Sequence, residues 1–295
     1  MKNFLTIKDL GRAGMYELIR QASELRDALD RNEQPPQSLQ GKCVANLFFE
    51  PSTRTQLSFD LAAQRLGANV ITFDAATSST SKGESLRDTV LTVSAIGADI
   101  LVVRHVDEGA PQLVADWTGL GVVNAGDGVN EHPTQALLDL VTIHRHFGDF
   151  ESLRVGIVGD IAHSRVAGSL VHALPKLGAE ITLVAPRSWL PRDSAHPTFD
   201  KLDPVLSDLD VVYVLRVQTE RGARFTDSYI SDLQLDSERL GRMREDAVVM
   251  HAGPMNRGVE ITDQVADSSR TLVTEQVRNG VPTRMAVLRN IGGDR

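Results

Sequence analysis

The chain has 295 residues, of which 41% are hydrophobic and 24% charged, and its formal net charge is −8. This length allows two domains of ordinary size, each with its own core, and the acidic balance argues against nucleic acid or an anionic membrane as a partner. No apolar run is long enough to span a bilayer, and no secretory signal is evident at the N-terminus. With a single cysteine, Cys43, these features predict a cytoplasmic protein without disulfides.

Apolar runs typical of buried strands alternate along the chain with segments of helical periodicity. The runs cover residues 44–49, 69–73, 99–103, 122–125, 154–158, 180–184, 211–215 and 247–251. This alternation predicts an α/β protein with two doubly wound parallel-sheet domains, each with helices on both faces. The polar, glycine-rich stretch 126–133 and the helix that follows it are predicted to form the domain boundary, and 187–203 is expected to be a surface loop or a short irregular helix.

A cluster of hydroxyl side chains and one arginine, Ser52-Thr53-Arg54-Thr55, follows the first predicted strand and begins a helical segment. Free backbone N–H groups at a helix start bind anions, and a planar guanidinium suits a phosphate. A plain helix cap would explain one hydroxyl but not the whole cluster. Because neither glycine pattern typical of nucleotide binding is present, the cluster predicts a phosphate site rather than a nucleotide site.

The cluster resembles the phosphate motif of the aspartate/ornithine carbamoyltransferase family, and Ser52, Thr53, Arg54 and Thr55 match it residue by residue. The resemblance covers nearly the whole chain. It implies that residues 1–131 bind carbamoyl phosphate, with a C-terminal helix over 274–295 packing back on them, and that residues 132–273 bind L-aspartate. The implied reaction is transfer of the carbamoyl group to the aspartate amine, the committed step of de novo pyrimidine biosynthesis.

Two further motifs match family contacts with the carbamoyl group. Arg104 ends the third predicted strand, where a surface salt bridge would be the ordinary interpretation. His132-Pro133-Thr134-Gln135 matches a His-Pro-x-Gln motif, although a proline there also suits a plain helix start. The resemblance implies that Arg104 and His132 contact the carbamoyl oxygen and Gln135 the amide. With Thr55 they would stabilise the negative charge that develops when an amine attacks the carbamoyl carbon.

In the second half, cationic side chains again follow predicted strands. Arg165 lies in a glycine-containing turn after 154–158, and Arg216 and Gln218 follow 211–215. A nicotinamide dinucleotide site is the physical alternative, but the glycine spacing is wrong and an arginine occupies the turn. The resemblance implies that Arg165, Arg216 and Gln218 bind the two aspartate carboxylates. Ornithine or an acylated ornithine is the alternative substrate, although the segments typical of ornithine enzymes are absent.

A polar loop over residues 77–86 would be read from composition alone as a solvated loop. It matches the family's Lys-Gly-Glu loop, which implies that Ser78 and Lys82 reach the active site of a neighbouring subunit. The implied assembly is a homotrimer with shared active sites, open to a regulatory or dihydroorotase-like partner subunit. The resemblance also implies that Glu50 pairs with Arg165 and Arg221.

The segment His251-Ala252-Gly253-Pro254 corresponds to a family loop that is usually His-Pro-x-Pro, so Ala252 departs from it. The loop's backbone is implied to hold the carbamoyl amide, with a cis peptide bond before Pro254. No cofactor is implied, and no metal is expected, since there is no cysteine cluster. A non-catalytic homologous subunit is a further alternative, disfavoured because the family's anion ligands are present.

Overall fold

The computed structural model describes residues 1–74, 83–219 and 227–293. The chain forms two compact units, Met1–Val141 with Arg278–Arg295, and Thr142–Val277. The division falls inside two helices, α5 (Pro133–Phe147) and α10 (Val273–Gly292). The assignment of one substrate to each unit stays a prediction.

The first unit is built on a four-stranded parallel sheet with the order β2-β1-β3-β4. Its strands are β1 (Cys43–Phe48), β2 (Asn69–Asp74), β3 (Ile100–His105) and β4 (Gly121–Asp127). Its other helices are α1 (Arg12–Asp30), α2 (Thr53–Arg65), α3 (Leu86–Ile96) and α4 (Ala110–Thr118). From β1 the chain first adds β2 on one side of the sheet and then returns to add β3 and β4 on the other side. The switch point, at which such sheets bind ligands, therefore lies between β1 and β3.

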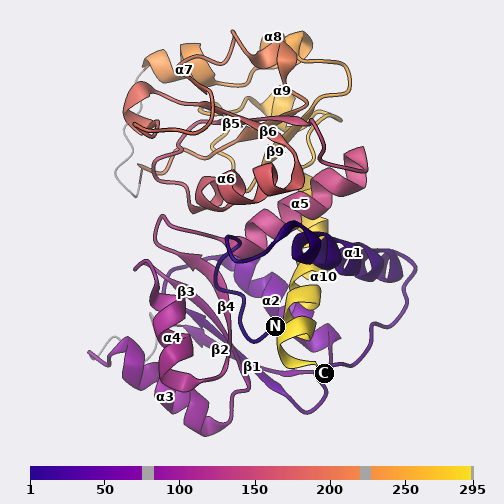
Figure 1. Cartoon of the computed structure of the whole chain (residues 1–295), viewed down its shortest axis with the longest axis vertical. Coiled ribbons are helices and arrows are strands. Elements are labelled where there is room, and N and C mark those ends of the chain that lie inside the picture. Colours follow the sequence, from indigo (N-terminus) through magenta and orange to yellow (C-terminus); the bar gives the residue numbers. More distant parts are fainter. Residues whose placement is uncertain (75–82, 220–226, 294–295) are drawn as a thin grey trace. The chain divides into compact units, whose positions relative to one another are not determined.

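Helices cover both faces of this sheet, as Figure 1 shows. Leu101 and Val103 share a core cluster with Val93 of α3 and Val114 of α4. Successive strand residues point to opposite faces, so Ile100 faces the other side. On that face Gly292 of α10 lies close to Ile100, because a Cβ added at Gly292 would be only 2.5 Å from Cδ1 of Ile100. Helix α2 contacts β1 and β2.

The second unit is built on a five-stranded parallel sheet with the order β7-β6-β5-β8-β9. Its strands are β5 (Arg154–Val158), β6 (Glu180–Val184), β7 (Thr198–Phe199), β8 (Val211–Val214) and β9 (Val248–His251). Its helices are α6 (Arg165–Leu177), η3 (Arg187–Trp189), η4 (Leu206–Asp208), α7 (Asp227–Leu233), α8 (Ser237–Arg242) and α9 (Asp263–Ala266). The switch point of this sheet lies between β5 and β8.

The predicted fold class is confirmed, and each of the eight predicted strands is present with ends that differ by at most two residues. The strand β7, however, was not predicted, because segment 187–203 was expected to contain no strand. Thr198 and Phe199 are both exposed and form only two ladder pairs with β6. A strand this short shows no alternation that a sequence pattern can reveal.

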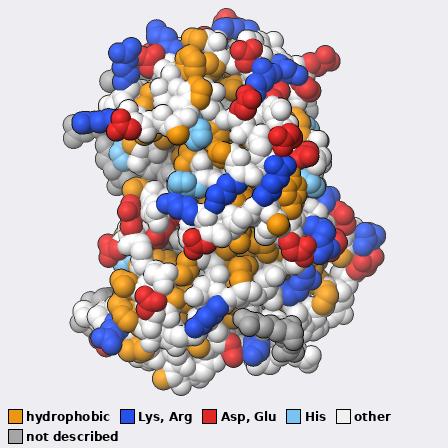
Figure 2. All heavy atoms as spheres, viewed as in Figure 1, with side chains coloured by type: hydrophobic (Ala, Val, Ile, Leu, Met, Phe, Trp, Pro, Cys, Tyr) orange, Lys and Arg blue, Asp and Glu red, His pale blue; other side chains and the backbone are white. Residues whose placement is uncertain are grey.

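The surface carries both signs of charge, and acidic and basic side chains occur across the face that Figure 2 shows. No helix in the described part of the chain is both long and apolar enough to cross a membrane. The cores of both units consist mainly of aliphatic side chains, as expected for a chain in which only 5% of the residues are aromatic.

Candidate functional site

In the first unit, the predicted phosphate cluster lies just beyond the carboxyl end of β1, on the first turn of α2. Ser52 is the N-cap residue, but its side chain makes no capping hydrogen bond. Thr53 and Arg54 are exposed, whereas Thr55 is buried at 6% exposure. The free N–H groups of this turn, the positive end of the helix dipole and the Arg54 guanidinium together suit an anion.

Arg104 lies at the carboxyl end of β3, one residue before its last, and directly beside β1, since Phe48 and Arg104 are partners in the ladder. Arg104 is buried at 8% exposure. Its Nη1 donates to the carbonyl of Ala125 at 3.3 Å, and its Nη2 lies 3.5 Å from Oε1 of Glu50. The strand order therefore brings Arg104 to the same sheet edge as the α2 start. The contact of Glu50 with Arg104 was not anticipated from the sequence.

The surroundings of the neighbouring His105 favour its neutral form. Burial lowers the pKa of His105, and the charges of Asp107 and Glu50 oppose that shift only partly. The backbone N–H of Asp107 donates to its Nδ1 at 3.0 Å, which requires this nitrogen to carry no proton. His105 is thus a half-buried histidine whose ring also lies against Phe49, with the two ring centres 5.3 Å apart.

His132 and Gln135 are positioned by the turn between β4 and α5. The carboxylate of Asp127 accepts hydrogen bonds from the backbone N–H groups of Gly109 at 2.8 Å and Glu131 at 3.2 Å, which fixes this turn. His132 is 4% and Gln135 9% exposed. Both therefore lie in a largely water-free environment, where a hydrogen bond to a bound group is stronger than in solvent.

In the second unit, the predicted residues Arg165, Arg216 and Gln218 follow two adjacent strands, β5 and β8. Arg165 begins α6 after β5 and is 5% exposed, and the preceding Ser164 caps the helix by accepting the N–H of Ala167 at 3.2 Å. Arg216 and Gln218 follow β8, the strand beside β5. The predicted arginines thus flank the switch point of this sheet.

A buried carboxylate, that of Asp160, ties the segments after β5 and β8 together. It accepts the backbone N–H of Gln218 at 2.9 Å, and the side-chain amide of Gln218 donates to the carbonyl of His163 at 2.7 Å. The His163 ring lies 2.6 Å from the same carboxylate. Asp160 was not predicted, although an acidic residue directly after a buried strand is a recognisable signal.

The loop after β9 has the geometry that the resemblance implied. The Gly253–Pro254 peptide bond is cis, and Gly253 has a φ of +64°, which favours glycine. Its N–H donates to Nδ1 of His251 at 2.7 Å, and the other ring nitrogen lies 3.2 Å from the buried Glu260. Asn256 donates to the carbonyl of Val217 at 3.2 Å, which joins this loop to the segment after β8.

Three predicted residues, Ser78, Lys82 and Arg221, lie outside the described residues. Their predicted roles stay predictions. Among the described residues, no group of three or more histidine, cysteine or acidic side chains is arranged to hold a metal ion.

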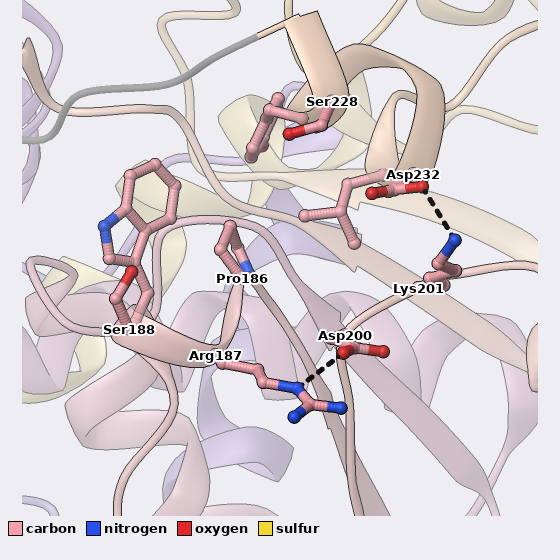
Figure 3. Close-up of a pocket in the computed structure, with 10 residues that line it drawn as sticks. Pro186, Arg187, Ser188, Asp200, Lys201, Ser228 and Asp232 are labelled. Carbon is pink, nitrogen blue, oxygen red and sulfur yellow. Dashed lines mark hydrogen bonds and ion pairs between the residues drawn. The ribbon is translucent and has the colours of Figure 1, made fainter.

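A pocket of about 290 Å³ in the second unit contains none of the predicted residues. Figure 3 shows its two ion pairs, Arg187 with Asp200 at 2.8 Å and Lys201 with Asp232 at 3.4 Å. Because each of these cations already has a carboxylate partner, the pocket offers little attraction to an anionic substrate. It is a separate hollow beside η3 and α7, not part of the predicted site.

Two family models match this chain. Residues 2–145 match the carbamoyl-P binding domain of aspartate/ornithine carbamoyltransferase, and residues 151–291 match the Asp/Orn binding domain. The chain belongs to the aspartate/ornithine carbamoyltransferase family. It is a carbamoyltransferase, as the sequence motifs predicted.

Relatives within this family are similar along nearly their whole length. The aspartate carbamoyltransferase catalytic subunit of Thermobifida fusca is 51% identical, and the match covers 98% of this chain and 94% of the relative. The corresponding subunit of Acidothermus cellulolyticus is also 51% identical, over 98% and 91% of the two chains. At this identity and coverage the relatives share the fold of both units.

Solved structures of aspartate transcarbamoylase from Trypanosoma cruzi have the same fold at 33% and 32% identity. The complex with N-(phosphonacetyl)-L-aspartic acid superposes with a TM-score of 0.90, covering 97% of this chain and 94% of that one. The complex with carbamoyl phosphate and aspartate superposes with a TM-score of 0.89 over the same shares. The crystals of the Trypanosoma cruzi enzyme therefore hold both substrates, or an analogue that joins them, on the same fold as this chain.

Proposed function

We propose that this carbamoyltransferase transfers the carbamoyl group of carbamoyl phosphate to the amine of L-aspartate, giving N-carbamoyl-L-aspartate and phosphate. The observation that carries the proposal is the pair of anion-binding arrangements, one at the switch point of each sheet. The aspartate carbamoyltransferase names of the relatives support the same substrate pair. The reaction would be the committed step of de novo pyrimidine biosynthesis.

Carbamoyl phosphate would bind to the first unit. Ser52, Thr53, Arg54 and Thr55 would hold the phosphate, because this helix start offers free N–H groups, hydroxyls and a guanidinium. Arg104 would contact both the phosphate and the carbamoyl oxygen. The exposure of Thr53 and Arg54 leaves these side chains accessible to a substrate from solvent.

Catalysis would rest on charge stabilisation and positioning. When the aspartate amine attacks the carbamoyl carbon, negative charge develops on the carbamoyl oxygen, and Thr55, Arg104 and His132 would donate hydrogen bonds to it. Preorganised donors of this kind are usually the largest single term in such reactions, and burial strengthens them. The amine is itself the nucleophile and phosphate leaves readily, so alignment of the two substrates would supply much of the remaining acceleration.

L-Aspartate would bind to the second unit through Arg165, Arg216 and Gln218. Two guanidinium groups match two carboxylates, whereas the cationic side chain of ornithine would be repelled by them. The Asp160 hydrogen bonds support this role, because they fix Gln218 against the turn that precedes Arg165. The backbone of Ala252, Gly253 and Pro254 would hold the carbamoyl amide, a contact that does not require the usual proline at 252.

The working assembly is proposed to be a cytoplasmic homotrimer in which Ser78 and Lys82 of one subunit complete the active site of its neighbour. The family resemblance of this polar loop supports the proposal. A regulatory or dihydroorotase-like subunit could join the trimer, since family members differ in this respect.

N-(phosphonacetyl)-L-aspartic acid joins analogues of the two substrates in one molecule, so its binding tests both proposed anion sites in a single experiment. We expect calorimetry to show tight binding to the wild type. Arg54→Ala and Arg216→Ala should each weaken it by about tenfold to a hundredfold, because each removes charged hydrogen bonds. Arg187→Ala is the matched control, since this exposed arginine of the second unit is paired with Asp200 away from the predicted site.

Two results would contradict the proposal. One is binding that is unchanged in both Arg54→Ala and Arg216→Ala. The other is a preference for the analogue in which ornithine replaces aspartate, which would favour the alternative substrate.

A further inference from the structure

A buried side-chain amide and a buried carboxylate lie one turn apart on α5. Nε2 of Gln135 donates to Oδ1 of Asp139 at 3.0 Å, and the carboxylate is fully buried at 0% exposure. Both residues stand in an otherwise apolar stretch of the helix, where their neighbours Leu138, Leu140 and Val141 are also buried. A polar pair in such surroundings is held firmly, because losing its hydrogen bond would leave buried groups unsatisfied.

This bond fixes which way the Gln135 amide faces. An ionised carboxylate can only accept hydrogen bonds, so the NH₂ group of Gln135, not its oxygen, must be the atom that meets Asp139. The carboxamide oxygen of Gln135 is then the polar atom left for another partner. Gln135 therefore presents an acceptor rather than a donor to any bound molecule.

The charge of Asp139 interacts with that of Arg284 on α10. In this unit α10 lies beside α5 (Figure 1), since a Cβ at Gly280 would lie 3.9 Å from Cδ2 of Leu138. Burial lowers the pKa of Arg284 to about 10, and the charge of Asp139 acts in the opposite direction. The Arg284 guanidinium stacks 5.0 Å from the ring centre of Phe59 on α2 and donates to the carbonyl of Gly280 at 3.1 Å. The positive charge of Arg284 in turn favours the ionised carboxylate of Asp139 and hence its acceptor role.

We propose that Asp139 is a positioning residue for substrate selection, which orients Gln135 so that its oxygen accepts a hydrogen bond from the NH₂ group of the carbamoyl substrate. This inference rests on the proposed function. An acetyl group has the shape of a carbamoyl group but carries a methyl in place of NH₂, so it cannot donate to this oxygen. Asp139 would thereby distinguish carbamoyl phosphate from acetyl phosphate without touching either of them.

The test compares the KM for carbamoyl phosphate with the inhibition constant of acetyl phosphate as its competitor. The double variant Asp139→Leu/Arg284→Met removes both buried charges, a replacement that is often tolerated. It leaves Gln135 present but no longer oriented. We expect the ratio of inhibition constant to KM to fall by about tenfold, because one hydrogen bond to the carbamoyl group is lost while acetyl phosphate is unaffected.

Asp139→Asn is the matched comparison. Its amide oxygen can still accept the Nε2–H of Gln135, but Arg284 loses its counter-charge, so the melting temperature should fall while the ratio is largely retained. Asn279→Ala controls for damage to α10, since it removes a buried bond to Arg26 and nothing from Gln135. Asp139→Ser, whose hydroxyl is too short to reach Gln135, replaces the double variant if the latter does not fold.

Two results would overturn the inference. One is a ratio that is unchanged in the double variant or in Asp139→Ser, because selectivity would then not depend on the Gln135 bond. The other is a ratio lost equally in Asn279→Ala, because selectivity would then follow stability. Failure of the proposed function is distinguishable, because the wild type would then form no carbamoyl-aspartate from carbamoyl phosphate.

Discussion

The side chains at the ends of β1 and β3 illustrate what residue type alone can predict. The hydroxyls of Ser52 and Thr55 and the Arg54 guanidinium are chemically suited to phosphate wherever they gather, so their grouping within four positions was informative. Asp139 was missed because its hydrogen bond and its charge partner, Arg284, become visible only when α5 and α10 are packed together. Sequence thus predicted the groups suited to substrate better than the groups that orient them.

His105 should make the stability of the protein depend on pH. Above its ordinary pKa of 6.5 the ring is neutral in the folded and unfolded chain. As the pH falls below that value, the unfolded chain takes up a proton more readily, because burial lowers the pKa in the folded state. The free energy of unfolding must therefore decrease on acidification.

His105→Gln should consequently lose less stability than the wild type between about pH 7 and about pH 5. Urea denaturation at the two pH values measures this difference. The exposed His146→Gln serves as the control and should follow the wild type. An identical loss in His105→Gln and wild type would show that His105 does not carry the effect.

At the scale of elements, α10 depends on a glycine in its interior. Gly280 is buried, and a Cβ at this position would lie 2.8 Å from Nη1 of Arg284. Gly280→Ala should displace the guanidinium and lower the free energy of unfolding by about 1–3 kcal/mol, even though alanine favours helix formation.

Gly241→Ala on α8 is the matched control for this prediction. A Cβ there meets nothing within 4 Å, so the variant should gain about 0.5–1 kcal/mol from helix propensity alone. Denaturation curves of the two variants measure both effects. A gain of stability in Gly280→Ala would contradict the packing described for Arg284.

The strands that were predicted and the one that was missed differ in a physical property. Seven of the eight predicted strands are mostly buried, and β2, at an edge of its sheet, is only partly buried; all eight consist largely of apolar residues, which a sequence pattern can reveal. The strand β7 is exposed and depends on β6 for its pairing, information that no local pattern contains. The sheet orders likewise depend on pairings between segments far apart in the chain, although doubly wound sheets were expected.

At the scale of the whole molecule, the proposed shared site makes a prediction about mixed assemblies. Arg54→Ala and Lys82→Ala should each be nearly inactive alone. If Lys82 serves a neighbouring subunit, random mixing in equal amounts should restore about one site in four, because some interfaces then combine two intact residues. Activity after subunit exchange, with the mixed trimers verified by native mass spectrometry, measures this recovery. Mixed trimers without recovered activity would indicate that each subunit supplies its own site.

Comparing two acceptor amines decides which substrate this carbamoyltransferase uses. Purified protein is incubated at neutral pH with carbamoyl phosphate and either L-aspartate or L-ornithine, and the carbamoylated product and phosphate are measured together. We expect equal amounts of N-carbamoyl-L-aspartate and phosphate with aspartate, and a far lower rate with ornithine, since Arg165 and Arg216 suit carboxylates. No product with aspartate, or faster carbamoylation of ornithine, would contradict the proposed function.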